Sequence, residues 1–236
     1  VRNRYEVWRG PGSPLIVQPV IAGGASISEN WNCADSGSLT CQLTWTEFLG
    51  ANWSIVSSQA DCALGDNEAR ANSILDSDDH YVEATVSTMT YVSGILSAEV
   101  LARKDTSTDV TYYLWQARRD TTTFGLFKGI FGGYTQLGSY TATPATGDVI
   151  RLICDGSTIT GRLNGVDRVS STDTGIVNNL YCGIRGYNDT PASDISRLDS
   201  WSAADLAGGG QNKMKWGIGM GVGGGGGANA RSGVIG

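Results

Sequence analysis

The residues that could carry out chemistry in this chain are few, and the histidine content limits them most. A Ser-His-Asp or Cys-His site needs an imidazole base beside its nucleophile. His80 is the only histidine in the sequence, and no Gly-x-Ser-x-Gly elbow is present to display a serine. We therefore exclude nucleophilic hydrolases of this kind and expect no catalytic residue.

Two glutamates, Glu83 and Glu99, lie in strand-like segments and are the candidates for acid–base chemistry. Glycoside hydrolysis needs two carboxylates that flank one bond, which on a strand means a spacing of i, i+2 or i, i+4. The same-face neighbours are Tyr81 and Thr85 for Glu83, and Ser97 and Leu101 for Glu99. Neither glutamate has a carboxylate partner, so we predict that the protein is not an enzyme.

The densest acidic cluster consists of Asp76, Asp78 and Asp79, just before His80. Carboxylate oxygens at alternating positions can hold calcium, but the glycine and the distal glutamate of an EF-hand loop are absent. An acidic turn before a strand is also commonly solvated. Two interpretations stay open, a calcium site or a solvated turn, and no other cofactor is predicted.

Three aromatic residues, Tyr112, Tyr113 and Trp115, are the candidate ligand-binding residues. They lie in a strand-like segment, so Tyr112 should point to one face and the other two to the opposite face. An outward aromatic would offer a platform on which a sugar ring can stack. Packing in the core explains the same residues equally well.

The elements that would position these residues are β-strands. The clearest stretch is 149–169, where Asp155-Gly156 and Asn164-Gly165 separate three alternating segments. These dipeptides accept the positive φ angles of two-residue hairpin turns. Further strand-like segments occupy 80–89, 94–104, 111–119, 124–130, 134–143, 181–187 and 195–206. Many short strands without a helical period predict an all-β sandwich or barrel.

A set of residues near the start of this region matches the N-terminal sequence motif of a known fold family. They are Trp31-Asn32, Ala34-Asp35, Leu49-Gly50, Trp53, Ser57 to Ala60 and Asn67 to Ala71, and 195–206 is similar to the closing strand. The chain thus resembles concanavalin A-like (LamG-type) domains, with Trp31 in place of Phe, Cys33 in place of Arg, and an insertion at 40–46. The resemblance covers about 28–206. It implies a two-sheet antiparallel jelly-roll sandwich.

The N-terminal stretch 1–27 differs in kind from this body. Pro11, Pro14 and Pro19 surround the apolar run Leu15, Ile16, Val17. Prolines so close together forbid a helix interior and a central strand, so the backbone should be extended. The segment is either an arm that lies on a partner or an edge segment packed on its own domain.

The C-terminal stretch 207–236 is dominated by glycine. Trp216, Ile218, Met220 and Val222 alternate with glycine, so an extended chain would carry all four on one face. A flexible linker is the alternative, but linkers favour Ser and Thr over large apolar residues. We predict an interaction arm, which gives three parts: arm 1–27, sandwich 28–206 and arm 207–236.

Five cysteines are present, and no Cys-x-x-Cys or Cys/His grouping suggests zinc. Cys154 and Cys182 fall in strand-like segments and are expected to be buried free thiols. Cys33 and Cys41 bracket a loop, where either a disulfide or free thiols would fit.

Composition restricts the partners. The net charge is -6 without a run of Lys or Arg, which argues against nucleic acid and anionic membranes. No run of about 18 apolar residues occurs, and the N-terminus lacks the apolar centre of a signal peptide. We expect a protein made in a host cytoplasm without export or membrane insertion.

These observations favour a structural role. Sandwiches that resemble this one occur among tailed-bacteriophage minor tail and capsid-decorating proteins. The resemblance therefore implies a non-enzymatic virion protein, located in the virion and bound through its arms to other virion proteins or to copies of itself. The alternative is a carbohydrate-binding module, alone or as the glycan-contacting part of such a protein.

Overall fold

The computed structural model describes residues 5–8, 16–19, 24–50, 52–106, 110–190 and 193–206. Side chains are described from residue 24 onward. These residues form strands, turns and loops without a helix, so none of them forms a helix that could cross a membrane. The all-β prediction is confirmed.

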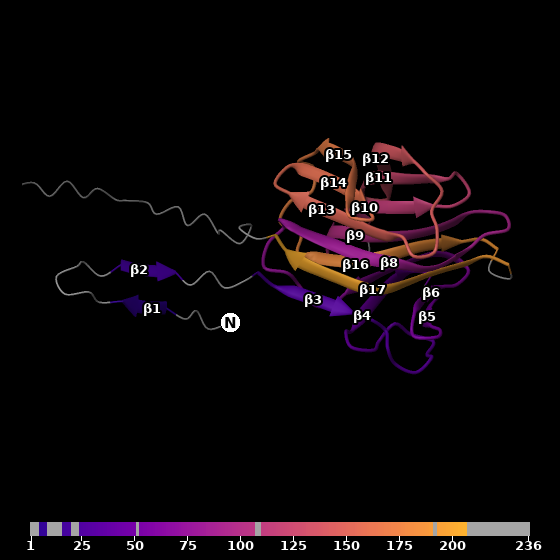
Figure 1. Cartoon of the computed structure of the whole chain (residues 1–236), viewed down its shortest axis with the longest axis horizontal. Helices are drawn as coiled ribbons and strands as arrows, with labels where there is room; N and C mark the ends of the chain where they lie inside the picture. The colour runs from indigo at the N-terminus through magenta and orange to yellow at the C-terminus, as the bar shows by residue number, and fades with distance from the viewer. Residues whose placement is uncertain are drawn as a thin grey trace, which may run out of the picture.

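Two antiparallel sheets form the body (Figure 1). The seven-stranded sheet has the order β12-β11-β10-β9-β16-β7-β4, and the eight-stranded sheet has the order β15-β14-β13-β8-β17-β6-β5, with β3 also paired to β17. The strands of the first sheet are β4 Trp45–Leu49, β7 Gly65–Ala71, β9 Leu96–Lys104, β10 Thr111–Arg118, β11 Thr123–Ile130, β12 Gly133–Thr141 and β16 Tyr181–Asn188. Those of the second are β3 Ser26–Glu29, β5 Trp53–Ile55, β6 Ala60–Cys62, β8 His80–Thr90, β13 Val149–Asp155, β14 Thr158–Leu163, β15 Val166–Thr172 and β17 Ile195–Asp205.

The meander β13-β14-β15 forms as its turn residues predict. Asp155 pairs with Thr158 and Leu163 with Val166, so each hairpin closes over a two-residue turn. Gly156, Asn164 and Gly165 have φ angles of 54°, 51° and 80°. Asn and Gly tolerate this left-handed region, which is why these dipeptides end one strand and start the next.

The main core lies between the two sheets, where alternate residues of each strand face inward. Trp115 on β10 packs into this core from the seven-stranded sheet, and its Nε1 donates to the carbonyl of Arg162 at 3.1 Å. Gly161 lies directly beneath the indole ring, where a Cβ would overlap it. A second, smaller cluster of Leu101, Tyr112 and Leu114 lies on the other face of the same sheet. The seven-stranded sheet therefore has an outer face with packing of its own.

A clamp around Glu29 fixes the loop that follows β3. Its carboxylate is buried and accepts four backbone N–H bonds, from Asn30, Trp31, Gln42 and Leu43. The same loop contains the disulfide between Cys33 and Cys41, which settles the alternative that the sequence left open. Cys154 and Cys182 are buried free thiols as expected, and so is Cys62.

His80 and Arg103 join the two sheets at the end where residues 25 and 205 meet. The N–H of Arg103 donates to Nε2 of His80 at 3.1 Å, so the ring proton is on Nδ1, which donates to the carbonyl of Ser77 at 2.8 Å. Both ring nitrogens are thereby used in a buried site. At the same end, Asp205 accepts the N–H of Ala25 at 2.7 Å.

The N-terminal stretch contains two short strands, β1 Tyr5–Trp8 and β2 Ile16–Pro19, which pair antiparallel with Trp8 opposite Ile16. Extended backbone was expected here because of the prolines. The predicted start of the sandwich at residue 28 falls inside β3, which already pairs with β17 from Ser26.

Candidate functional site

A row of polar residues crosses the outer face of the seven-stranded sheet. Gln116 pairs with Glu99, Glu99 with Arg185, and Arg185 with Glu68, on the adjacent strands β10, β9, β16 and β7. Residues directly opposite one another on neighbouring strands point to the same face. The register therefore brings four polar residues from distant parts of the chain side by side.

Glu99 is the centre of this row, and its carboxylate is fully paired. It accepts hydrogen bonds from Ser97 Oγ at 2.7 Å, from Gln116 Nε2 at 2.6 Å and from Arg185 Nη1 at 2.7 Å. Arg185 also donates to Asp66 Oδ2 at 2.7 Å. Burying a carboxylate is costly unless it is paired in this way. The network consequently fixes Gln116, which lies at its edge.

Glu68 anchors a second group on the same face. Tyr112 donates to Glu68 Oε2 at 2.7 Å, and Lys104 Nζ lies 3.4 Å from Glu68 Oε1. Burial raises the pKa of Glu68, and the bonds from Tyr112 and Lys104 offset this only in part. The hydroxyl of Tyr134 is 2.8 Å from that of Tyr112, and Tyr134 as a residue is 43% exposed. Tyr134 thus covers the charged group from the solvent side.

A hollow of about 250 Å³ opens beside the polar row, above β10, β11 and β12. It is lined by Gln116, Arg118, Thr121, Thr123, Gly125, Phe127, Gln136 and Ser139. Phe127 lies over Gly125, where a Cβ would meet its ring. Since glycine leaves this space free, the half-buried ring forms one wall among amide and hydroxyl groups. The volume is below the ~300–1,000 Å³ of pockets that enclose drug-sized ligands and suits a single small ring.

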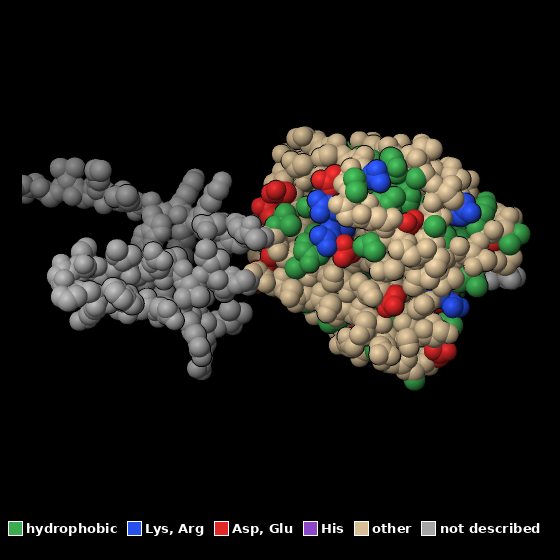
Figure 2. All heavy atoms as spheres, viewed as in Figure 1, with side chains coloured by type: hydrophobic (Ala, Val, Ile, Leu, Met, Phe, Trp, Pro, Cys, Tyr) green, Lys and Arg blue, Asp and Glu red, His purple; other side chains and the backbone are tan. Residues whose placement is uncertain are grey.

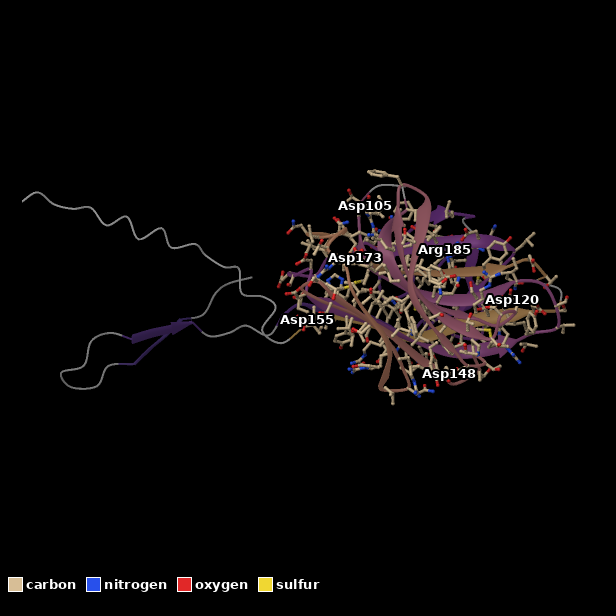
Figure 3. All side chains as sticks on the ribbon, turned by 90° about the horizontal axis from the view of Figure 1, so that it is seen from above. Asp105, Asp120, Asp148, Asp155, Asp173 and Arg185 are labelled. Atoms are coloured by element: carbon tan, nitrogen blue, oxygen red, sulfur yellow. A yellow bond between two sulfur atoms is a disulfide. The ribbon has the colours of Figure 1, made fainter. Side chains whose placement is uncertain are left out.

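The guanidinium of Arg118 is already occupied at the rim of the hollow. Its Nε lies 3.0 Å from Asp120 Oδ1 and 3.2 Å from Oδ2, and its Nη2 lies 3.0 Å from Oδ2. Asp120 and Arg185 are labelled in Figure 3, where both lie on the body away from the end marked by Asp155 and Asp173. Because Arg118 is paired with Asp120, the hollow is polar but the charge at its rim is balanced.

The aromatic platform predicted at Tyr112, Tyr113 and Trp115 is not available to a ligand, because all three residues are fully buried. The two-face alternation itself is present. Tyr113 and Trp115 face the main core, and Tyr112 belongs to the outer-face cluster but is covered. The alternative interpretation, core packing, is the one that the structure supports.

The acidic cluster before β8 serves as a set of acceptors. Asp79 Oδ1 accepts from Gly156 N at 2.7 Å and from Arg103 Nη2 at 3.3 Å. Asp78 Oδ2 accepts from Asn178 N at 2.8 Å and lies 3.9 Å from Arg103 Nε. Within the described ranges, no group of three or more His, Cys, Asp or Glu is placed to hold a metal ion. Calcium at Asp76, Asp78 and Asp79 stays a prediction without support.

The predicted assembly residues fall mostly outside the described part of the chain. Leu15, Trp216, Ile218, Met220 and Val222 lie beyond it, and Ile16 and Val17 are described only as backbone of β2. The arms therefore stay predictions.

On the face shown in Figure 2, basic and acidic side chains lie next to one another.

The same-face neighbours predicted for the two glutamates are found. Ser97 bonds to Glu99, and Leu101 lies on the outer face. Arg151 binds Glu83 at 2.7 Å and stacks over Tyr81 at 4.4 Å, so these two share a face. The lining residues of the hollow were missed. Gln116 and Arg118 alternate with buried Trp115 and Ala117, which is the signal that would have placed them outward.

The comparisons with known proteins agree with the fold. No protein-family model matches the chain, and no curated protein matches it in sequence. Among solved structures, 300 chains match, and they show a concanavalin A/galectin-like jelly roll. This defines the class of fold to which the chain belongs and confirms the predicted sandwich.

Three of these structures illustrate the likeness. A lichenase (β-1,3-1,4-glucanase) from a mouse hindgut metagenome has a TM-score of 0.56 and 11% identity, over 77% of this chain and 99% of its own. The carbohydrate recognition domain of Emp47p has a TM-score of 0.55 and 8% identity, over 80% of this chain and 100% of its own. Carbohydrate-binding module CBM66 of Bacillus subtilis has a TM-score of 0.51 and 15% identity, over 70% of this chain and 94% of its own. Enzymes and binding modules thus share this fold with the chain.

Proposed function

We propose that the protein binds carbohydrate, and that the glycan docks in the hollow above β10, β11 and β12. The single observation that carries the proposal is the lining: one half-buried aromatic ring, Phe127, among amide and hydroxyl groups. A sugar presents an apolar ring face and a rim of hydroxyls, which is the chemistry that such a lining complements. Neighbours that are a carbohydrate-binding module and a carbohydrate recognition domain support the proposal.

We further propose that this binding is not accompanied by hydrolysis. Among the outer-face carboxylates, Glu99 lies on β9 and Asp66 and Glu68 lie on β7, and strand β16 separates β9 from β7. Strands lie ~4.8 Å apart, so their backbone positions are ~10 Å apart. Glu99 is held by Arg185 and Gln116, and Glu68 by Tyr112 and Lys104. Asp66 lies two positions before Glu68 on the same face of β7, but its carboxylate is bonded to Arg185 at 2.7 Å. All three carboxylates are therefore committed to protein partners, which argues against their acting as the acid and base that flank one bond.

The virion role and location stay predictions. They depend on the arms 1–27 and 207–236, most of which lies outside the described residues. A carbohydrate-binding body is compatible with display on such a particle, where it would contact a glycan.

The test is glycan binding by the full chain on an array of neutral and acidic oligosaccharides. The variants Phe127→Ala and Gln136→Ala are expected to weaken binding by about tenfold, the first through lost stacking and the second through lost hydrogen bonds. Phe131→Ala is the matched control, because Phe131 is 82% exposed and does not line the hollow.

Gln136 is exposed, so its variant reports binding without a change in packing. The proposal fails if the protein binds no glycan, or if both hollow variants bind as tightly as the Phe131→Ala protein.

A further inference from the structure

The charges beneath and beside the hollow leave no obvious place for an anionic ligand. Glu99 is bonded to Gln116, which lines the hollow, and Asp120 is bonded to Arg118, which forms its rim. A carboxylate that entered would therefore approach two carboxylates. Each repels the carboxylate of the ligand to the extent that its paired arginine does not cancel its charge, and this effect grows as water is excluded from the site.

The cations that could offset this repulsion are committed to protein carboxylates. Arg118 makes a forked contact with Asp120, with three N···O distances of 3.0 to 3.2 Å. Arg185 divides its two terminal nitrogens between Glu99 and Asp66, each at 2.7 Å. Forked pairs between Arg and carboxylate are among the stronger hydrogen-bonded contacts. An acidic sugar would have to displace one of them.

The polar groups that remain suit hydroxyls. Gln116, Thr121, Thr123, Gln136 and Ser139 are uncharged and both donate and accept. The contact of Gln116 Nε2 with Glu99 fixes the direction of its amide, so the group is held in place before a ligand arrives. Such preorganised amides reduce the cost of ordering on binding.

We propose that the hollow selects uncharged glycans and rejects their carboxylated counterparts, with Asp120 as the residue that keeps Arg118 from binding an acidic sugar. This inference rests on the proposed function, because it names the class of glycan for the same site.

The experiment uses matched pairs of oligosaccharides built from glucose, galactose or mannose, each compared with the same oligosaccharide oxidised to the uronate at C6. The full chain should bind neutral members and bind their uronate partners at least about tenfold more weakly. Asp120→Asn frees Arg118 without a change in side-chain size. It should raise affinity for the uronate members by about fivefold or more, and this gain should fall at high salt.

Asp167→Asn is the matched control. It frees Arg162, whose Nε lies 2.6 Å from Asp167 Oδ1 on the eight-stranded sheet, so it makes the same change of charge away from the hollow. Asp167→Asn should leave the preference for neutral over uronate oligosaccharides unchanged.

Equal or tighter binding of uronates by the unmodified chain would overturn the inference while leaving carbohydrate binding intact. So would an Asp120→Asn protein that gains nothing over Asp167→Asn. Binding to no member of any pair would instead contradict the proposed function itself.

Discussion

At the scale of residues, the outer face of the seven-stranded sheet depends on pairing of buried charges. Glu99, Arg185 and Asp66 form one connected set, and Glu68 and Lys104 form another. Removing one member of such a pair leaves an uncompensated buried charge, which is costly. An uncompensated buried charge would also arise at His80, which joins the two sheets and is buried as a neutral ring.

His80 should make the fold sensitive to acid. Burial lowers its pKa below 6.5, and the hydrogen bond to Ser77 opposes this only in part. The unfolded chain therefore binds a proton at a higher pH than the folded chain. The stability from neutral His80 is complete above pH 6.5 and is lost as the pH falls toward the folded-state pKa.

The measurement is an NMR titration of the imidazole, which gives one set of signals because the chain has a single histidine. A midpoint at or above 6.5 in the folded protein would contradict the prediction. Urea unfolding at decreasing pH measures the predicted loss of folding stability.

At the scale of elements, single residues decide how loops and sheets join. Glu29 holds the loop after β3 through four N–H donors, and Gly161 on β14 allows Trp115 of β10 to cross the core. In both cases one element could not adopt its position without a specific residue in another.

Glu29→Gln should destabilise the protein by about 2–3 kcal/mol, because one oxygen is replaced by a donor that faces two N–H groups. Glu83→Gln is the matched control. It removes only the partly exposed pair with Arg151 and should cost about 1 kcal/mol or less. Urea unfolding of the two variants measures the difference, and equal losses would disprove the clamp.

Gly161→Ala should destabilise the protein by about 2 kcal/mol, because the added methyl group overlaps the Trp115 ring and the core must shift. Gly37→Ala is the control, since a Cβ there meets no heavy atom within 4 Å. A Gly161→Ala protein as stable as the Gly37→Ala protein would show that the two sheets can separate at no cost.

At the scale of the whole molecule, charge divides between the body and the ends. Stretch 24–206 holds 22 of the 23 acidic residues but only 11 of the 17 basic ones. The two terminal stretches together carry six basic residues and one acidic residue, Glu6. The ends and the body thus differ in charge as well as in composition.

Deleting 213–236 should weaken assembly without unfolding the body, because the described core clusters use residues from 25 to 203. Thermal unfolding should be unchanged, and sedimentation of the full chain with a particle or with itself should be lost. Unchanged assembly would refute the predicted C-terminal arm, and a lower melting temperature would show that this stretch packs on the body.

The sequence by itself determined the strands from β8 to β17 and the turns of the meander, whereas β3 to β7 were not predicted as strands. Alternation in β8 and the Asp-Gly and Asn-Gly turns of the meander are local properties, since strand period and positive φ depend on neighbouring residues alone. The strand pattern predicted a sandwich or barrel, and the jelly roll was implied by the resemblance of the residues around Trp31 and of 195–206 to concanavalin A-like domains. The absence of a same-strand carboxylate partner for Glu99 was also visible, because face assignment needs only the period of two.

Only the tertiary structure decided which residues meet. Alternation could place Tyr112 opposite to Trp115, but it could not show that Tyr112 is covered by Tyr134 or that Trp115 is covered by the second sheet. The row Gln116, Glu99, Arg185 and Glu68 spans strands up to 117 positions apart, and its register depends on pairing across the whole sheet. Burial and long-range register are properties of the packed molecule, so the hollow and its charge balance could not be predicted from local pattern.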